Sequence, residues 1–151
     1  MNRVEISLEG VESPSWLDGV SPFVLAVLDK LEKCNWDLSL LLCDNGYIRS
    51  LNKQYRSLDE PTDVLSFTLG ETGGDRYQSG DIVISLDMLA ENAVYFKVSP
   101  DEELRRLIIH GILHLGGMDH VSNDSEEPML RLQERLLQEL SHLSIITQEQ
   151  R

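Results

Sequence analysis

The chain has 151 residues, enough for one compact domain with its own hydrophobic core and no need of a metal or disulfide to fold. Its net charge of −13 at pH 7 disfavours loose binding to nucleic acids or anionic membranes, so any nucleic-acid function must depend on a local patch. No apolar stretch approaches the roughly 18 to 20 residues of a membrane span, and the N-terminal segment lacks the pattern of a signal peptide. We therefore expect a soluble cytoplasmic protein without membrane contact, in which the reduced thiols of Cys34 and Cys43 serve packing.

The first part of the chain predicts two strand–helix pairs. Weak alternation over residues 4–8 indicates a strand, and a serine–proline pair followed by an apolar stripe predicts a helix over residues 22–33. Residues 38–43 are apolar on both faces, which is typical of a strand covered on both sides. Asp44 or Asn45 can then cap a helix that ends near Arg56.

The second part predicts a pair of strands and then three helices. Residues 64–68 and 81–85 read as strands joined by a long, mobile, glycine-rich loop over residues 69–80. A helix follows from about Leu86, a second begins at Ser99-Pro100 and ends at Gly116-Gly117, and the last covers residues 125–143. This order predicts one α+β domain over residues 1–151, with a mixed sheet of about four strands packed against about five helices.

Three of the four histidines form the pattern His110-x-x-x-His114-x-x-Gly117-x-x-His120. His110 and His114 are four residues apart on a predicted helix, so both imidazoles leave the same face. Gly116-Gly117 can break the helix with a positive φ and bring His120 to the same metal ion. Three imidazoles leave one tetrahedral position of zinc to water, whose pKa falls to about 7, so the pattern predicts one Zn²⁺ used for hydrolysis. The alternative is a set of buried histidines satisfied by hydrogen bonds.

Gly111 separates this pattern from the long zinc-protease consensus, His-Glu-x-x-His-x-x-Gly-x-x-His. Those proteases use the glutamate as general base, so its absence argues against peptide hydrolysis. A glycine within a helix costs about 1 kcal/mol relative to alanine, so a side chain at position 111 would obstruct either the substrate or helix packing. Asp119 has two readings as well: it orients an imidazole or acts on the bound water, or it stabilises the turn after the helix.

Arg49, Lys53 and Arg56 share one face of a predicted helix and form a basic stripe, either a solvated face or a binding surface. The stripe leads into residues 52–67, which end in Pro-Thr-Asp-Val-Leu-Ser-Phe. Together with Gly80-Asp-Ile-Val-Ile-Ser85 and the histidine pattern, this segment resembles the YbeY family of bacterial endoribonucleases, which act in ribosomal RNA maturation. The resemblance covers residues 38–142.

The resemblance implies that His110, His114 and His120 ligate one Zn²⁺ and that Arg56 is the functional arginine, so we expect Arg56 and His114 to be catalytic. Zinc and a guanidinium can stabilise the charge of a phosphodiester transition state without a glutamate base. The implied function is a zinc-dependent, single-strand-specific endoribonuclease in late 16S ribosomal RNA maturation and ribosome quality control, with single-stranded RNA and a ribosomal subunit as partners. Two alternatives stay open: a metal-dependent hydrolase of another substrate, such as a peptidase, and a non-enzymatic ribosome assembly factor with a structural zinc.

Overall fold

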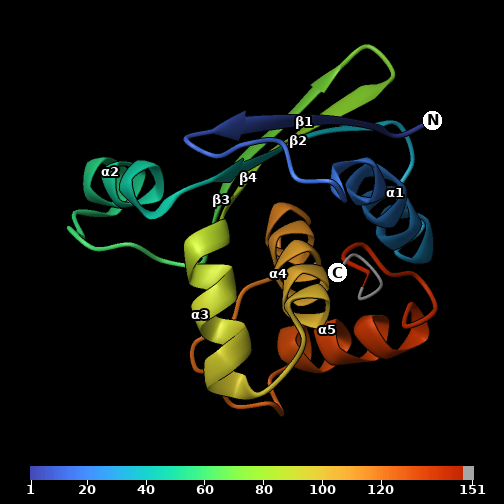
Figure 1. Cartoon of the computed structure of the whole chain (residues 1–151). Coiled ribbons are helices and arrows are strands. Elements are labelled where there is room, and N and C mark those ends of the chain that lie inside the picture. Colours follow the sequence, from blue (N-terminus) through green and yellow to red (C-terminus); the bar gives the residue numbers. More distant parts are fainter. Residues whose placement is uncertain (148–151) are drawn as a thin grey trace.

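Residues 1–147 are described by a computed structural model, and they form a four-stranded mixed sheet with five α-helices (Figure 1). The predicted α+β class is confirmed. In chain order the elements are β1 (Arg3–Glu9), the short 3-10 helix η1 (Leu17–Gly19), α1 (Val20–Lys30), β2 (Trp36–Cys43), α2 (Asn45–Arg56), β3 (Val64–Gly73), β4 (Arg76–Ser85), α3 (Leu86–Phe96), α4 (Pro100–Leu115) and α5 (Pro128–Glu139). None of the helices within residues 1–147 combines the length and the apolar character that crossing a bilayer requires.

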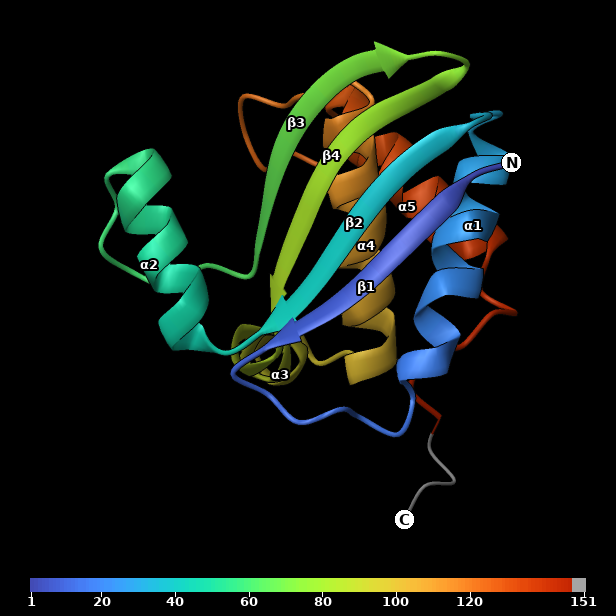
Figure 2. The ribbon, with the colours of Figure 1, turned by 90° about the horizontal axis from the view of Figure 1, so that it is seen from above.

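The sheet has the strand order β1-β2-β4-β3. Its β1–β2 and β2–β4 pairs are parallel, and β3 runs antiparallel to β4, so β3 forms one edge. Helices α1, α4 and α5 lie on one face of the sheet (Figure 2). Helix α2 packs against part of the opposite face, through a small cluster that joins its Ile48 to Leu65 of β3 and Val83 of β4.

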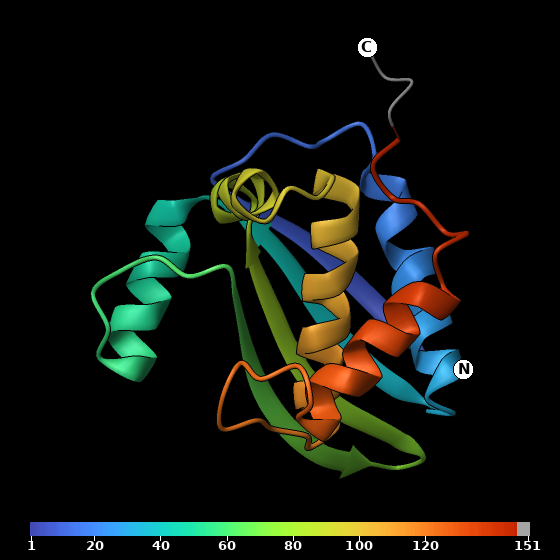
Figure 3. The same cartoon turned by 90° about the horizontal axis from the view of Figure 1, so that it is seen from below.

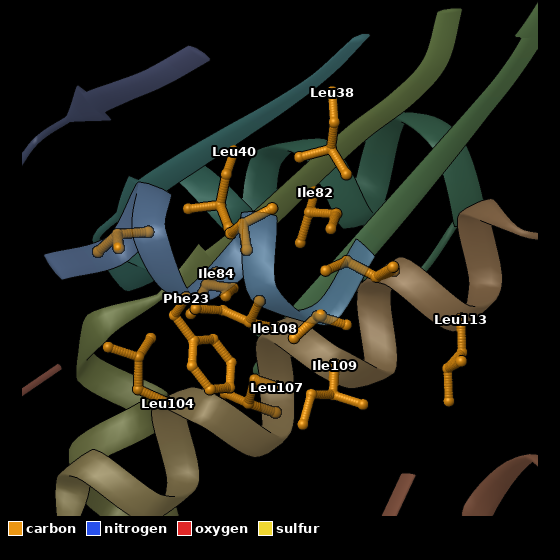
Figure 4. Packing of buried hydrophobic residues seen from close by; sticks show 14 of the residues in the cluster. Phe23, Leu38, Leu40, Ile82, Ile84, Leu104, Leu107, Ile108, Ile109 and Leu113 are labelled. Atoms are coloured by element: carbon orange, nitrogen blue, oxygen red, sulfur yellow. The ribbon is translucent and has the colours of Figure 1, made fainter. Parts of the chain in front are cut away.

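The main core lies between the sheet and α4. Alternate residues of the two central strands, among them Leu40, Ile82 and Ile84, point toward buried α4 side chains such as Ile108 (Figure 4). Helix α1 closes the end of this layer with the fully buried Phe23. Burial of one such side chain contributes roughly 1.5 to 3 kcal/mol. Helix α4 is therefore held firmly on several sides, which makes it a rigid support for side chains on its last turns.

The predicted mobile loop over residues 69–80 was wrong. These residues extend the β3–β4 hairpin, with Thr72 opposite Tyr77 and a bulge between Thr68 and Glu71. The glycines there make the bulge and the tight turn, where Gly70 and Gly74 have φ values of 67° and 63°. Glycine content alone could not separate these local bends from a long loop.

Four helix boundaries, those of α1 and α5, also differ from the prediction. Helix α1 begins at Val20, two residues before the predicted start at Pro22. It ends at Lys30 rather than at residue 33, because Glu32 adopts a left-handed φ of 58°. Helix α5 begins at Pro128 rather than near residue 125, since proline suits the first helical position, and it ends at Glu139 rather than at residue 143.

Candidate active site

Helix α4 begins and ends where its local signals place it. Ser99 accepts a hydrogen bond from the amide of Glu102 at 3.0 Å, and Pro100 occupies the first turn. At the other end, Gly117 has a φ of 97° and the amide of Met118 donates to the carbonyl of Leu113 at 3.0 Å. The predicted glycine break is thus confirmed, and it turns the chain back beside edge strand β3 (Figures 2 and 3).

The turn brings the three histidines of the pattern together. The Nε2 atoms of His110 and His114 lie 3.1 Å apart, and one ligand atom from each of these residues and His120 falls within 4.8 Å of the others. Two nitrogens bound tetrahedrally at the usual zinc distance would lie about 3.3 Å apart. The spacing of the donors therefore fits a single metal ion. The prediction that the three side chains converge is confirmed.

The opposite ring nitrogen of each histidine faces an oxygen acceptor. His110 Nδ1 lies 2.7 Å from Gln133 Oε1, His114 Nδ1 lies 3.1 Å from the Met118 carbonyl, and His120 Nδ1 lies 2.7 Å from the Ser122 carbonyl. A neutral imidazole that donates from Nδ1 has its lone pair on Nε2. The three Nε2 lone pairs then point toward one another with no proton between them. A bound cation would offset the repulsion between these lone pairs. The donor set therefore fits a bound metal ion.

The environment also favours the neutral, ligating state of two of these rings. Burial lowers the pKa of His110, and the hydrogen bond to Gln133 only partly offsets this effect. Burial is likewise the largest cause of the lowered pKa of His114, with a further contribution from His110 beside it. Neutral imidazole is the form that binds metals.

The hydrogen bond that Asp119 forms is with the backbone of the turn after α4 and not with an imidazole. Its carboxylate accepts a hydrogen bond from the amide of His120 at 2.8 Å and lies 4.0 Å from His114 Nδ1, while the Met118 carbonyl takes the closer contact with that ring. The side chain is 85% exposed. Asp119 thus stabilises the turn that presents His120.

Glu127 supports the same turn and was not singled out from the sequence. Its carboxylate accepts hydrogen bonds from the Ser122 hydroxyl and from the amides of Val121 and Ser122. The hydroxyl contact is the largest cause of the lowered pKa of Glu127. These contacts hold the carbonyl of Ser122 that faces His120. No local sequence pattern distinguishes this glutamate from its acidic neighbours.

Gly111 faces the sheet. A Cβ atom added at this position would lie 2.8 Å from Cγ2 of Ile82 on β4, which is too close for a stable contact. Of the two readings, the structure supports close helix packing rather than access for a substrate. The same crowding leaves no room for a glutamate like that of the zinc proteases.

Arg56 and the histidines line one cleft of about 840 Å³. Arg56 is the last residue of α2, and Ser57 ends the helix with a left-handed φ of 61°. Asn52 is buried and donates to the carbonyl of Glu60 at 2.9 Å, which fixes the loop that follows. Within residues 1–147 the guanidinium of Arg56 forms no salt bridge, so its charge faces the cleft unpaired. Lining the cleft are Tyr55, Arg56, Asp63, Val64, Leu65, Ser66, Phe67, Thr68, His110, His114, Gly117, Met118, Asp119 and His120.

The basic stripe is weaker than the sequence suggests. Arg49 forms a salt bridge with Asp59, with 2.8 Å between Nε and Oδ1. Asp59 therefore offsets one of the three positive charges, and Arg49 does not line the cleft. Arg56 is the stripe residue that lines the same cleft as the histidines.

Gln133 is the clearest site residue that sequence reasoning missed. It is 7% exposed and projects from α5 toward His110. Its place in the sequence carried a signal, because it is a polar residue four positions from both Met129 and Leu137, which belong to the buried stripe of that helix.

Gln133 also belongs to a chain of polar contacts, termed here the polar relay, that joins the two walls of the cleft. The relay starts at Asp63, at the entry to β3, and ends at His110. Its contacts are Asp63–Asn92 at 3.0 Å, Asn92–Glu103 at 3.5 Å, Glu103–Arg106 at 3.3 Å, Arg106–Glu134 at 2.9 Å, Glu134–Gln133 at 3.1 Å and Gln133–His110 at 2.7 Å.

Comparisons with known proteins bear on the family of the chain. The family model described as Endoribonuclease YbeY matches residues 7–141. A Treponema denticola protein named Endoribonuclease YbeY is 50% identical, with 95% of this chain and 97% of that protein covered. A Treponema pallidum protein of the same name is 48% identical, with 91% of this chain and 89% of that protein covered. The solution structure of TM1509 from Thermotoga maritima shares 31% identity, with a TM-score of 0.63 over 91% of this chain and 89% of that one. The chain belongs to the YbeY family of endoribonucleases.

Proposed function

We propose that the chain is a zinc-dependent endoribonuclease that cuts single-stranded RNA in the cytoplasm, during late 16S ribosomal RNA maturation and ribosome quality control. The observation that carries this proposal is the cleft that Arg56 lines together with three converging imidazoles. His110, His114 and His120 would hold the ion, and Arg56 and His114 are the residues we assign to catalysis. The relatives named Endoribonuclease YbeY support an RNA substrate.

The chemistry divides between the two walls of the cleft. A zinc ion held by His110, His114 and His120 would supply a Lewis acid for the phosphodiester. The histidines keep their Nε2 lone pairs toward the ion because each Nδ1 donates to a fixed oxygen. The Arg56 guanidinium binds non-bridging phosphate oxygens and stabilises the negative charge that grows in the transition state.

The negative net charge of the chain favours a mechanism in which a partner brings the RNA to the cleft. A net charge of −13 repels a polyanion over most of the surface, so contact with RNA is confined to the cleft. Affinity for a ribosomal subunit would raise the local concentration of the correct strand. Accumulation of uncut 16S precursor in cells that lack the protein, and its disappearance on complementation, would test this part.

The first experiment measures zinc content and cleavage of a single-stranded RNA on the same untagged sample. His114→Ala should lose both zinc and cleavage. Arg56→Ala should keep its zinc and lose cleavage by about 100-fold or more, since it removes a charge from the transition state. Arg49→Ala is the matched control, because Arg49 lies on the same helix but outside the cleft. Full cleavage by His114→Ala, or by protein stripped of metal, would refute the proposal.

The two alternatives predict different results. A peptidase would cut casein faster than RNA under the same conditions. Gly111 packs against Ile82, which supports the view that no glutamate base can stand next to His110. A structural zinc would need a fourth protein ligand, whereas the group of side chains within residues 1–147 that could share one ion has three members. That open position supports an enzyme over an assembly factor with a structural zinc.

A further inference from the structure

We propose that Tyr55 and Phe67 form a stacking site for one unpaired nucleobase beside the phosphate that Arg56 binds. The inference rests on the proposed function and names the part of the substrate that the cleft recognises. Both rings line the cleft that holds the histidines, and Tyr55 directly precedes Arg56 in the chain.

Tyr55 is exposed in a way that packing does not explain. Its side chain is 60% exposed, although it stands on a helix whose buried face is already supplied by Ile48, with Leu51 half-buried beside it. Phe67 rests against that small cluster, but Tyr55 lies outside it. Within residues 1–147 the phenol forms no hydrogen bond, and the Tyr55 ring pairs with the Phe67 ring. The tyrosine thus offers its surface to the cleft.

The two rings are arranged to hold a flat ligand. Their centroids lie 5.2 Å apart at an interplanar angle of 66°, so the edge of one ring supports the other. An edge-to-face pair leaves a ring face free for a base to stack on. Phe67 sits on β3, which the sheet and its neighbour β4 hold in place, so the pair is positioned before a ligand arrives.

The position of the pair accounts for a single-strand preference. A base in a duplex has both faces stacked on its neighbours, so it cannot reach an aromatic side chain on the protein. Every base has a π-face, so the site would tolerate different sequences. Stacking on one aromatic side chain contributes about 5- to 100-fold in affinity for a single strand. Contact with a phosphate at Arg56 and a base at Tyr55 would select an unpaired nucleotide of any identity.

The test measures binding of a 2′-O-methyl RNA oligonucleotide by fluorescence anisotropy, together with versions that carry one abasic position each. Tyr55→Ala should weaken binding about 5- to 100-fold, and Tyr55→Phe should bind like the wild type because the ring remains. One abasic position should weaken wild-type binding by a similar factor and leave Tyr55→Ala unchanged. The matched control is Tyr95→Ala, because Tyr95 is 79% exposed and pairs with Phe96 in the same edge-to-face manner on α3, outside the cleft.

The outcomes separate this inference from the proposed function. If the wild type binds and cuts single-stranded RNA while Tyr55→Ala binds as tightly, the stacking site is refuted and the nuclease proposal stands. An abasic effect that persists in Tyr55→Ala overturns the stacking site in the same way. If the wild type neither binds nor cuts single-stranded RNA, both fail. Zinc content and circular dichroism of Tyr55→Ala should match the wild type, since the side chain is exposed.

Discussion

Replacement of Gln133 by alanine should weaken metal binding without removing any ligand. Gln133 is 7% exposed, and its Oε1 atom lies 2.7 Å from Nδ1 of His110. Its Nε2 atom donates to Glu134 at 3.1 Å, which sets the orientation of the amide. Alanine removes the acceptor that keeps the His110 proton on Nδ1 and the lone pair on Nε2. The ring can then rotate or change tautomer.

Two independent estimates give a similar loss of zinc affinity for Gln133→Ala. A half-buried Nδ1–H left without an acceptor costs about 1 to 3 kcal/mol. Loss of an outer hydrogen bond to a metal-ligating histidine lowers metal affinity about 10- to 100-fold, which corresponds to roughly 1.4 to 2.7 kcal/mol. We therefore expect the zinc dissociation constant of Gln133→Ala to rise by about 10- to 100-fold.

The assay is competition for zinc against a chromophoric chelator at pH 7. Gln133→Glu keeps an acceptor for Nδ1, but its second oxygen faces the Glu134 carboxylate in place of the amide that donates to it, so we expect a zinc affinity between those of the wild type and Gln133→Ala. Gln138→Ala is the matched control, since Gln138 is an exposed glutamine on the same helix. If Gln133→Ala binds zinc as tightly as the wild type while His110→Ala does not, the reasoning on ligand orientation is refuted.

Three further predictions concern packing, the turn and the thiols. Gly111→Ala should lower the free energy of unfolding by about 1 to 3 kcal/mol in urea, because its Cβ would lie 2.8 Å from Ile82. Gly117→Ala should weaken zinc binding, because a φ of 97° strains any residue with a side chain and a relaxed turn moves His120. Ellman's reagent should label Cys34 in the native protein and reach Cys43 only on unfolding, since burial raises the pKa of the Cys43 thiol to about 12.

Each of these predictions has its own control. Gly46→Ala, in α2, has no contact closer than 3.7 Å and should be neutral or stabilising, so equal losses at positions 46 and 111 would contradict the packing argument. Wild-type zinc affinity in Gly117→Ala would show that the turn tolerates another backbone conformation. Equal labelling rates for both thiols in the native state would show that Cys43 is not protected.

Local sequence signals predicted much of the fold and the part of the candidate site that lies on α4 and the turn after it. The cap at Ser99, the proline after it and the i, i+4 spacing of His110 and His114 act within one helix, so they are legible in the sequence. Gly117 adds the turn, again through a local backbone preference. The expected packing role of cysteine held for Cys43, which is buried, and was wrong for the exposed Cys34.

Contacts between distant segments could not be predicted in this way. The hairpin at residues 69–80 is stabilised partly by Arg76, which forms a 2.7 Å salt bridge with Asp37 on another strand. Arg56 faces the histidines only because the sheet brings α2 and α4 to the same cleft, and its importance was indicated by family resemblance rather than by any pattern around it. Gln133 meets His110 across a separation of 23 residues.

The polar relay has a mechanical consequence. It is a continuous chain of polar contacts between the wall of the cleft formed by β3, at Asp63, and the wall formed by the histidines, at His110. Such a chain of contacts would limit the movement of the two walls relative to each other before RNA binds. Asn92, on α3 and outside the cleft lining, is the residue of the relay that contacts Asp63 directly, and its amide also lies 3.5 Å from Glu103. Between Asp63 and His110 the link runs through side chains of α3, α4 and α5, so the two walls are joined by the helical layer rather than by the loops around the cleft.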